Sequence, residues 1–265
     1  MVERPLEHKV AVVTGASRGI GAAIALACAA AGADVGLVAR APQPSAGSPL
    51  SNLSPDGGEA LRTVAERARA LGVTALPLGA DVSDEAQVRA ALAQVAARWA
   101  RIDVLVNCAG IGVFGPVAET STADWDRVMA VNARGPFLMC REALPLLARN
   151  GQPGSMQACI LNVASVVGIK GYVNQAAYTA SKHALMGFTK VLAQELQPEG
   201  IRVHALCPGG VDTDLISDAR PDLDRSVLMT AEEVAAVAMF LITQRGNAVV
   251  DQINLRRAVS SPWFC

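Results

Sequence analysis

Aromatic residues and clustered metal ligands are scarce in this chain of 265 residues. Aromatic residues make up 4% of the sequence, whereas hydrophobic residues make up 51%. This balance favours helices packed on a buried parallel sheet over an aromatic-rich β-sandwich. The three histidines lie far apart, and the six cysteines include no C-x-x-C pair. The sequence therefore predicts free thiols and no metal site.

Long apolar runs and blocks of like charge are also missing. The formal net charge is −1, and no stretch is rich in Lys and Arg, which excludes nucleic acid and anionic membranes as expected partners. No apolar run reaches the roughly 20 residues that span a bilayer, and the first residues lack the apolar core of a signal peptide. We therefore expect a cytoplasmic protein.

Short β-branched runs alternate with helical segments along the whole chain. The expected strands are 9–14, 34–39, 74–79, 103–107, 158–163, 202–207 and 251–255. Because the repeats continue without a break, we expect one α/β domain over residues 1–265 with a parallel sheet. A Pro/Gly/Ser-rich segment, 41–58, is predicted to be a loop.

A glycine-rich turn follows the first expected strand. Gly15, Gly19 and Gly21 lie between that strand and an Ala-rich helix, the context of a dinucleotide-binding turn. Glycine allows positive φ and lets a pyrophosphate approach the free N–H groups of the helix N-terminus. The alternative is a tight turn that binds nothing.

The second expected strand ends at Arg40, about twenty positions beyond the glycines, where such proteins read the adenosine ribose. A basic residue there favours a 2′-phosphate, and Arg18 lies inside the turn itself. Guanidinium groups match phosphate geometry with paired donors, so the two arginines predict NADP(H). The alternative is that both are solvated surface residues.

Both tyrosines, Tyr172 and Tyr178, fall within a stretch that also holds Ser165 and Lys182. Tyr178 and Lys182 are four residues apart, so they share one face of a helix. A nearby ammonium is expected to lower the pKa of the phenol and to make it a usable acid or base. Ser165 follows an apolar strand. The alternative is an ordinary surface helix with a polar pair.

Residues 124–148 are expected to form one long helix that kinks at Pro136. Proline has no N–H to donate to the carbonyl of Asn132, four residues earlier. We therefore expect that carbonyl to be free to hold a water molecule.

Taken together, these motifs resemble those of the short-chain dehydrogenase/reductase family, in its ketoacyl-reductase-like branch, over nearly the whole chain. The matching elements are TGASRGIG (14–21), Asp81, NCAG (107–110), Asn132, Ser165, Tyr178-x-x-x-Lys182 and Pro208-Gly209. The resemblance implies a Rossmann-type, doubly wound parallel sheet of about seven strands. It departs at Cys108, at Gly210, and at a C-terminal end without the frequent T-G-x-x-x-x-V-D-G-G pattern.

The resemblance also implies the site residues. Four are catalytic: Asn132, Ser165, Tyr178 and Lys182. Tyr178 is the acid/base, Ser165 steadies the substrate oxygen, and Lys182 binds the nicotinamide ribose. The cofactor-binding positions are Gly15, Ser17, Arg18, Gly19, Ile20, Gly21, Arg40, Asp81, Val82, Asn107, Ala109, Gly110, Tyr178, Lys182, Pro208, Gly209, Val211 and Thr213. Among these, Asp81 contacts adenine and Thr213 the carboxamide.

The sequence thus predicts an NADP(H)-dependent carbonyl reductase or alcohol dehydrogenase. Its substrate is expected to be a ketone or secondary alcohol, such as a 3-oxoacyl thioester or a small carbonyl compound. Pocket walls at 111–117, 166–174 and 210–226 predict a mainly apolar ligand. The alternative is a catalytically silent NADP(H)-binding sensor, although all four catalytic positions are filled. Helices apolar on more than one face predict a homo-oligomer, a tetramer or a dimer.

Overall fold

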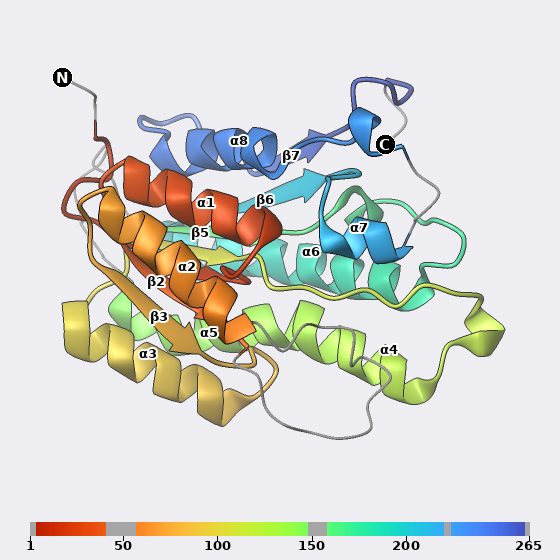
Figure 1. Cartoon of the computed structure of the whole chain (residues 1–265), viewed down its shortest axis with the longest axis horizontal. Coiled ribbons are helices and arrows are strands. Elements are labelled where there is room, and N and C mark those ends of the chain that lie inside the picture. Colours follow the sequence, from red (N-terminus) through yellow and green to blue (C-terminus); the bar gives the residue numbers. More distant parts are fainter. Residues whose placement is uncertain (1–3, 41–56, 148–157, 220–223, 263–265) are drawn as a thin grey trace.

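The computed structural model describes residues 4–40, 57–147, 158–219 and 224–262 (Figure 1). Seven strands form one sheet in which all neighbours are parallel, in the order β3-β2-β1-β4-β5-β6-β7. The strands are β1 (Val10–Thr14), β2 (Asp34–Ala39), β3 (Ala75–Gly79), β4 (Val104–Asn107), β5 (Cys159–Val163), β6 (Arg202–Pro208) and β7 (Gln252–Leu255). The predicted doubly wound sheet is confirmed. Residues 41–56 of the predicted loop lie outside the described residues.

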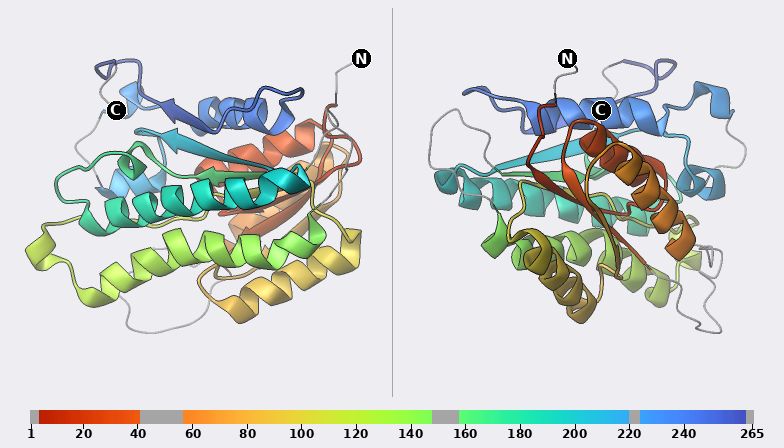
Figure 2. Two further views of the ribbon diagram at one scale, coloured as in Figure 1. Left: turned by 180° about the vertical axis from the view of Figure 1, so that it is seen from behind. Right: turned by 60° about the vertical axis from the view of Figure 1, so that its left-hand side comes forward.

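Helices cover both faces of the sheet (Figures 1 and 2). One layer holds α1 (Gly19–Ala30), α2 (Gly57–Ala70) and α8 (Ala231–Thr243). The other holds α3 (Glu85–Trp99), α4 (Thr122–Met129), α5 (Gly135–Ala143) and α6 (Ala176–Leu196). Strand β1 serves both layers, since Ala11 and Val13 join the first core and Val12 the second.

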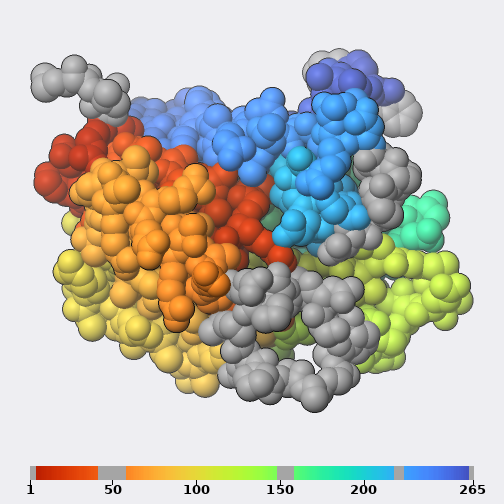
Figure 3. All heavy atoms as spheres, viewed as in Figure 1, coloured from red at the N-terminus to blue at the C-terminus, as the bar shows by residue number. Residues whose placement is uncertain are grey.

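Five short 3₁₀ segments complete the described structure, with α7 (Asp214–Ala219) beyond β6. They are Val117–Glu119, Leu144–Leu146, Val166–Gly168, Gln197–Glu199 and Arg225–Val227. The space-filling view shows the red segment that leads into α1 next to the light-blue segment that contains α7 (Figure 3). The glycine turn and α7 therefore share one face of the molecule.

The position of a ligand follows from the strand order. Strand β1 pairs with β2 on one side and with β4 on the other, so the chain reverses its direction across the sheet at β1. Open α/β sheets bind ligands in the crevice beyond the carboxyl ends of the strands at such a switch point. The turns after β1 and β4 are the two segments that meet there.

Local sequence signals account for the helix boundaries. Asp84 caps α3 by accepting hydrogen bonds from Ala86 N (2.9 Å) and Gln87 N (3.1 Å). Thr230 and Glu233 form the capping box of α8. The single helix expected over 124–148 is instead divided: a π-helical turn, Ala130–Arg134, lies between α4 and α5, just before Pro136.

None of the helices in the described ranges is both long enough and apolar enough to cross a membrane. The five described cysteines carry free thiols, as the sequence predicts.

Candidate active site

The glycine turn after β1 has a geometry that only glycine fits. Gly15 and Gly19 have φ of 68° and 54°, and a Cβ on Gly15 would lie 2.9 Å from the backbone of Ala109. A Cβ on Gly21 would lie 2.2 Å from the carbonyl oxygen of Gly15. No side chain caps the N-terminus of α1, and its first turn holds no acidic residue. Backbone donors there suit a pyrophosphate, so the turn fits a dinucleotide.

Thr14 joins this turn to the segment after β4. Its hydroxyl oxygen accepts hydrogen bonds from Cys108 N (3.0 Å) and Ala109 N (3.1 Å). The side chain of Asn107 is buried and donates to Asn162 Oδ1 (2.9 Å) and to Cys140 Sγ (3.2 Å). The N–H groups of this amide are therefore already paired, and contact between Asn107 and a cofactor stays a prediction.

Three arginines gather at the end of β2, one more than the sequence indicated. Burial lowers the pKa of Arg40, the positive charges of Arg127 and Arg18 add to that effect, and Asp81 opposes it. Arg18 itself is paired with Asp214 (2.8 Å), a residue of α7, and both side chains are exposed. No local sequence signal marks Arg127, which comes to this place from α4.

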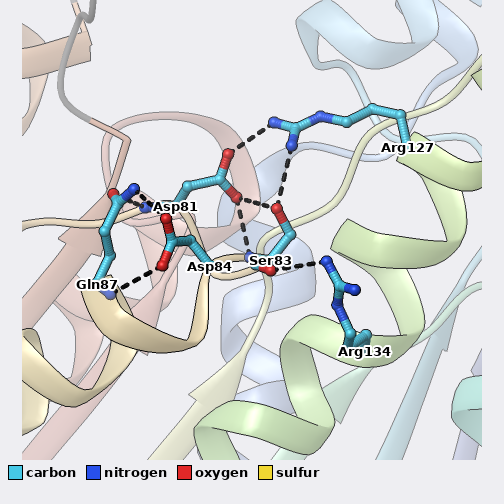
Figure 4. A network of polar contacts seen from close by, with 6 residues as sticks. All are labelled: Asp81, Ser83, Asp84, Gln87, Arg127 and Arg134. Atoms are coloured by element: carbon cyan, nitrogen blue, oxygen red, sulfur yellow. Dashed lines mark hydrogen bonds and ion pairs between the residues drawn. The ribbon is translucent and has the colours of Figure 1, made fainter. Parts of the chain in front are cut away.

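Asp81 is held by a polar network at the start of α3 (Figure 4). One carboxylate oxygen accepts from Ser83 N (2.9 Å) and Ser83 Oγ (2.6 Å), and the other from Arg127 Nη2 (2.7 Å). Burial acts to raise the pKa of Asp81, but the hydrogen bonds from Ser83 and Arg127 outweigh it and the pKa is lowered. Asp81 is thus an ionised, fixed carboxylate, and its contact with adenine stays a prediction.

The same network is anchored to the π-helical turn. Arg134, at the end of that turn, donates to Ser83 O (2.9 Å), and Arg127 Nη1 donates to Ser83 Oγ (3.0 Å). Next to it, Val82 is buried, and a Cβ on Gly135 would lie 2.8 Å from its side chain. The predicted cofactor positions Asp81 and Val82 are therefore fixed to the segment that carries Asn132.

The hydroxyls of Ser165 and Tyr178 meet at the carboxyl end of β5. Ser165 donates to Pro208 O (3.3 Å) and is hydrogen-bonded to Tyr178. Burial raises the pKa of Tyr178 to about 12, and the hydrogen bond with Ser165 acts in the opposite direction. The expectation of a lowered phenol pKa is wrong here, because desolvation of the half-buried phenol outweighs the hydrogen bond with Ser165.

Lys182 lies beneath Tyr178 on the same face of α6, as the four-residue spacing predicts. Its ammonium is 5.7 Å from the centroid of the Tyr178 ring and donates to Val163 O (3.0 Å). Burial lowers the pKa of Lys182 to about 8. The ammonium is thus directed at a strand carbonyl rather than at the phenol oxygen.

Asn132 lies at the centre of the π-helical turn, and its side chain is fully buried. Its Oδ1 accepts from Ile111 N (2.9 Å), and its Nδ2 donates to Ile111 O (2.8 Å) and Ser181 Oγ (3.0 Å). A Cβ on Gly110 would lie 3.5 Å from this amide and 3.6 Å from the Lys182 ammonium. The structure therefore brings Gly110, Asn132 and Lys182 together.

A cavity of about 540 Å³ opens beside Tyr178. Seven of the predicted site residues line it: Ile20, Ser165, Tyr178, Pro208, Gly209, Val211 and Thr213. Of the predicted apolar wall, Phe114, Val166, Val167, Tyr172, Leu215 and Ile216 contribute, whereas Val113 and Val173 do not. Sequence reasoning missed a fourth wall, which residues 256, 257 and 259–261 supply from beyond β7.

Three further predicted positions border a second cavity. Ser17, Arg18 and Gly19 line a space of about 470 Å³ together with residues of α1, α2 and α8. Thr213 connects the two regions, because it lines the first cavity and lies 3.2 Å from the position of a Cβ on Gly19.

Comparison with known proteins gives the same picture. The model of the short chain dehydrogenase family matches residues 9–224. D-threitol dehydrogenase of Mycolicibacterium smegmatis is 37% identical over 247 residues, which cover 89% of this chain and 86% of that protein. A metagenomic short-chain oxidoreductase solved with NADP is 33% identical, with a TM-score of 0.76, covering 96% of this chain and all of that one. A metagenomic blue fluorescent protein solved with NADPH is 30% identical, with a TM-score of 0.80, covering 97% of this chain and all of that one.

The glycine turn, the Ser165–Tyr178 pair and Lys182 thus occur in a sheet and a sequence that both match one family. This chain belongs to the short-chain dehydrogenase/reductase family of oxidoreductases.

Proposed function

We propose that the chain is an NADP(H)-dependent oxidoreductase that interconverts a ketone and a secondary alcohol. One observation carries this proposal: Ser165 and Tyr178 line the same cavity, which also reaches Ile20 of the glycine turn. A carbonyl oxygen in that cavity has a hydrogen-bond donor and a proton donor within one site. The substrate is a 3-oxoacyl thioester or a small carbonyl compound, which the volume of about 540 Å³ can hold.

The glycine turn, Gly110, Asn107 and Thr213 hold the cofactor, and bound nicotinamide supplies or accepts the hydride. Tyr178 gives its proton to the carbonyl oxygen in the reductive direction. With a pKa of about 12, the phenol stays protonated throughout the neutral range and is ready to act as an acid. Ser165 orients the same oxygen by hydrogen bonding.

Lys182 and Asn132 assist proton transfer by Tyr178. Lys182 binds the nicotinamide ribose, and its ammonium stabilises the phenolate that forms when Tyr178 gives up its proton. The carbonyl of Asn132 holds a water molecule that returns the proton. Pro136 supports this role because it has no N–H to donate to that carbonyl.

The choice of NADP(H) follows from the arginines at the end of β2. Arg40 and Arg18 bind the 2′-phosphate, and Arg127 offsets the negative charge of the ionised Asp81, to which it is paired at 2.7 Å. Two solved relatives, with NADP and NADPH bound, support the same cofactor. Asp34, the acidic residue of β2, is at the opposite end of the strand, where it accepts from Trp99 Nε1 (2.9 Å).

Replacement of Tyr178 tests the mechanism. Tyr178→Phe removes the transferable proton and leaves the ring, so kcat should fall about 100-fold or more while NADPH affinity stays nearly constant. The matched control is Tyr172→Phe, because Tyr172 lines the same cavity but is exposed and outside the Ser165 pair. The measurement is NADPH consumption with a panel of ketones, aldehydes and 3-oxoacyl thioesters.

Two results contradict the proposal in different ways. Wild-type turnover in Tyr178→Phe would refute the role of the tyrosine. Tight NADPH binding by the wild-type protein without reduction of any carbonyl would instead support the silent sensor.

We also infer that the chain forms a homo-oligomer through α5 and α6. Phe137 and Val191 are 42% and 54% exposed on these helices, and the Phe137 ring packs edge-on against Phe188 with centroids 6.1 Å apart. An apolar surface shared by two adjacent helices favours burial against a second copy. A dimer or a tetramer fits this surface.

A further inference from the structure

The cavity beside Tyr178 is lined by positively charged side chains as well as by apolar ones. Lys170, Arg256 and Arg257 all line it, and no Asp or Glu is among its lining residues in the described part of the chain. The ligand that this cavity accepts therefore meets an excess of positive charge in the same space as the Ser165 and Tyr178 hydroxyls.

The two arginines reach the cavity because β7 extends the sheet next to β6. Leu255 is in register with Pro208, and Leu255 O accepts a hydrogen bond from Gly209 N (2.8 Å). Pro208 O is also the acceptor for the Ser165 hydroxyl. Residues 256 and 257 thus leave the sheet directly beside the reactive end of the site.

Arg256 and Arg257 have different surroundings. Nη1 of Arg256 donates to the carbonyl oxygens of Arg257 (3.2 Å), Ala258 (3.1 Å) and Ser260 (2.8 Å). These bonds, with Ser260 N to Arg257 O (2.9 Å), fold the segment back over the cavity. Arg256 is therefore a structural residue of this turn.

Arg257 is half-buried, and its guanidinium has no hydrogen bond or ion pair with any residue in the described ranges. Its side chain lies on Gly210: a Cβ at that position would be 3.4 Å from Arg257 Cδ and 3.6 Å from Nε. Gly210 and Arg257, which both line the cavity, are thus in contact with each other. A guanidinium offers five donors in a fork that matches a carboxylate or a phosphate.

We propose that Arg257 binds an anionic group of the substrate, with Lys170 as a second cation of the same cavity. The substrate class is then a ketone or secondary alcohol that carries a carboxylate or a phosphoryl group. The apolar wall of Phe114, Val166 and Leu215 accommodates the carbon chain. This inference rests on the proposed function, because it names the substrate of that same site.

The test compares matched substrates on the purified full chain with NADPH. One arm uses an oxo-carboxylate and its methyl ester, and a second uses the corresponding oxo-phosphonate and its dimethyl ester. We expect kcat/KM to favour an acid over its ester roughly tenfold or more, and added salt to lower only the value for the acid. The acid with the larger preference over its ester, carboxylate or phosphonate, identifies the anionic group that the site binds.

Variants locate the effect. Arg257→Gln should lower kcat/KM for the acid roughly ten- to hundredfold, through KM, and leave the ester within about twofold. Arg89→Gln is the matched control, since Arg89 lies on α3 and pairs with Glu85 outside the cavity.

Several outcomes would overturn the anion site. They are equal use of acids and esters by the wild type, an unchanged acid preference in Arg257→Gln, or an equal loss for both substrates with weaker NADPH binding. The last result would place Arg257 on the cofactor. If Arg257→Gln does not fold, Arg257→Lys takes its place and must keep part of the preference for the acid over the ester. The effect of salt on the wild type then still tests the anion site.

Binding separates this inference from the proposed reaction. Quenching or enhancement of bound NADPH fluorescence by the acid, but not by the ester, needs no turnover. Loss of that response in Arg257→Gln supports the anion site even when no substrate is reduced. An absence of reduction would then refute only the proposed reaction.

Discussion

Arg40 is expected to contribute more to cofactor choice than Arg18, although both lie near the end of β2. Arg40 is beside Arg127 and Arg18, and its own guanidinium carries no ion pair in the described ranges. Arg18 is already paired with Asp214 at 2.8 Å. Arg18 must therefore leave or share that partner before it binds a phosphate.

The sizes of these effects follow from exposure. A hydrogen bond between a guanidinium and a phosphate contributes about 1.5–3 kcal/mol, so Arg40→Gln should weaken NADPH binding roughly ten- to hundredfold. The side chains of Arg18 and Asp214 are 47% and 61% exposed, and such pairs contribute about 0–1 kcal/mol. Breaking the pair offsets part of what Arg18 gains, so Arg18→Gln should weaken NADPH binding less than Arg40→Gln does.

Arg40→Asp should reverse the preference. Its carboxylate repels the 2′-phosphate and accepts hydrogen bonds from a free ribose hydroxyl, as in NAD-binding relatives of this architecture. We expect kcat with NADH to stay close to that of the wild type with NADPH, because the substitution is far from Tyr178. Asp214→Asn should raise NADPH affinity slightly by releasing Arg18.

The assay is the dissociation constant of NADPH and of NADH from nicotinamide fluorescence, with kcat/KM for both cofactors. Arg89→Gln controls for the loss of a surface arginine. Equal use of NADH and NADPH by the wild type would refute this account of the arginines. An unchanged NADPH/NADH ratio in Arg40→Gln would refute the role of Arg40 alone.

Three further predictions address the proton, the glycine turn and assembly. The pKa of Lys182 is about 8 and that of Tyr178 about 12. The value of kcat/KM for reduction should therefore be constant below pH 8 and should fall above it as Lys182 loses its charge. A flat profile to pH 10 would argue against a role for the Lys182 charge. Gly21→Ala places a Cβ 2.2 Å from Gly15 O, so it should abolish NADPH binding and lower Tm. Gly115→Ala is the control, because Gly115 has open space around it and its replacement should change neither property. Thermal melts with and without NADPH measure both. Val191→Glu on the exposed face of α6 should convert the oligomer to a monomer in light scattering, and a wild-type monomer at micromolar concentration would contradict the assembly.

The sequence by itself determined the features that depend on neighbours within a few residues. The strand, glycine turn and helix at 10–30 follow from backbone sterics, and the shared face of Tyr178 and Lys182 follows from the helical period. Asp84 and the Thr230–Glu233 box act within three residues, so their caps were predictable. The missing N–H of Pro136 likewise predicted a distortion, now seen as a π-helical turn.

Tertiary structure decided what depends on residues far apart in the chain. Arg18 meets Asp214 across 196 positions, and Arg127 meets Asp81 across 46, so neither partner was visible in a local pattern. The pKa of Tyr178 rises because the folded chain shields much of the phenol from water, an effect that the spacing to Lys182 cannot reveal. Arg257 reaches the cavity because β7 pairs with β6, and long-range packing rather than local propensity sets that pairing.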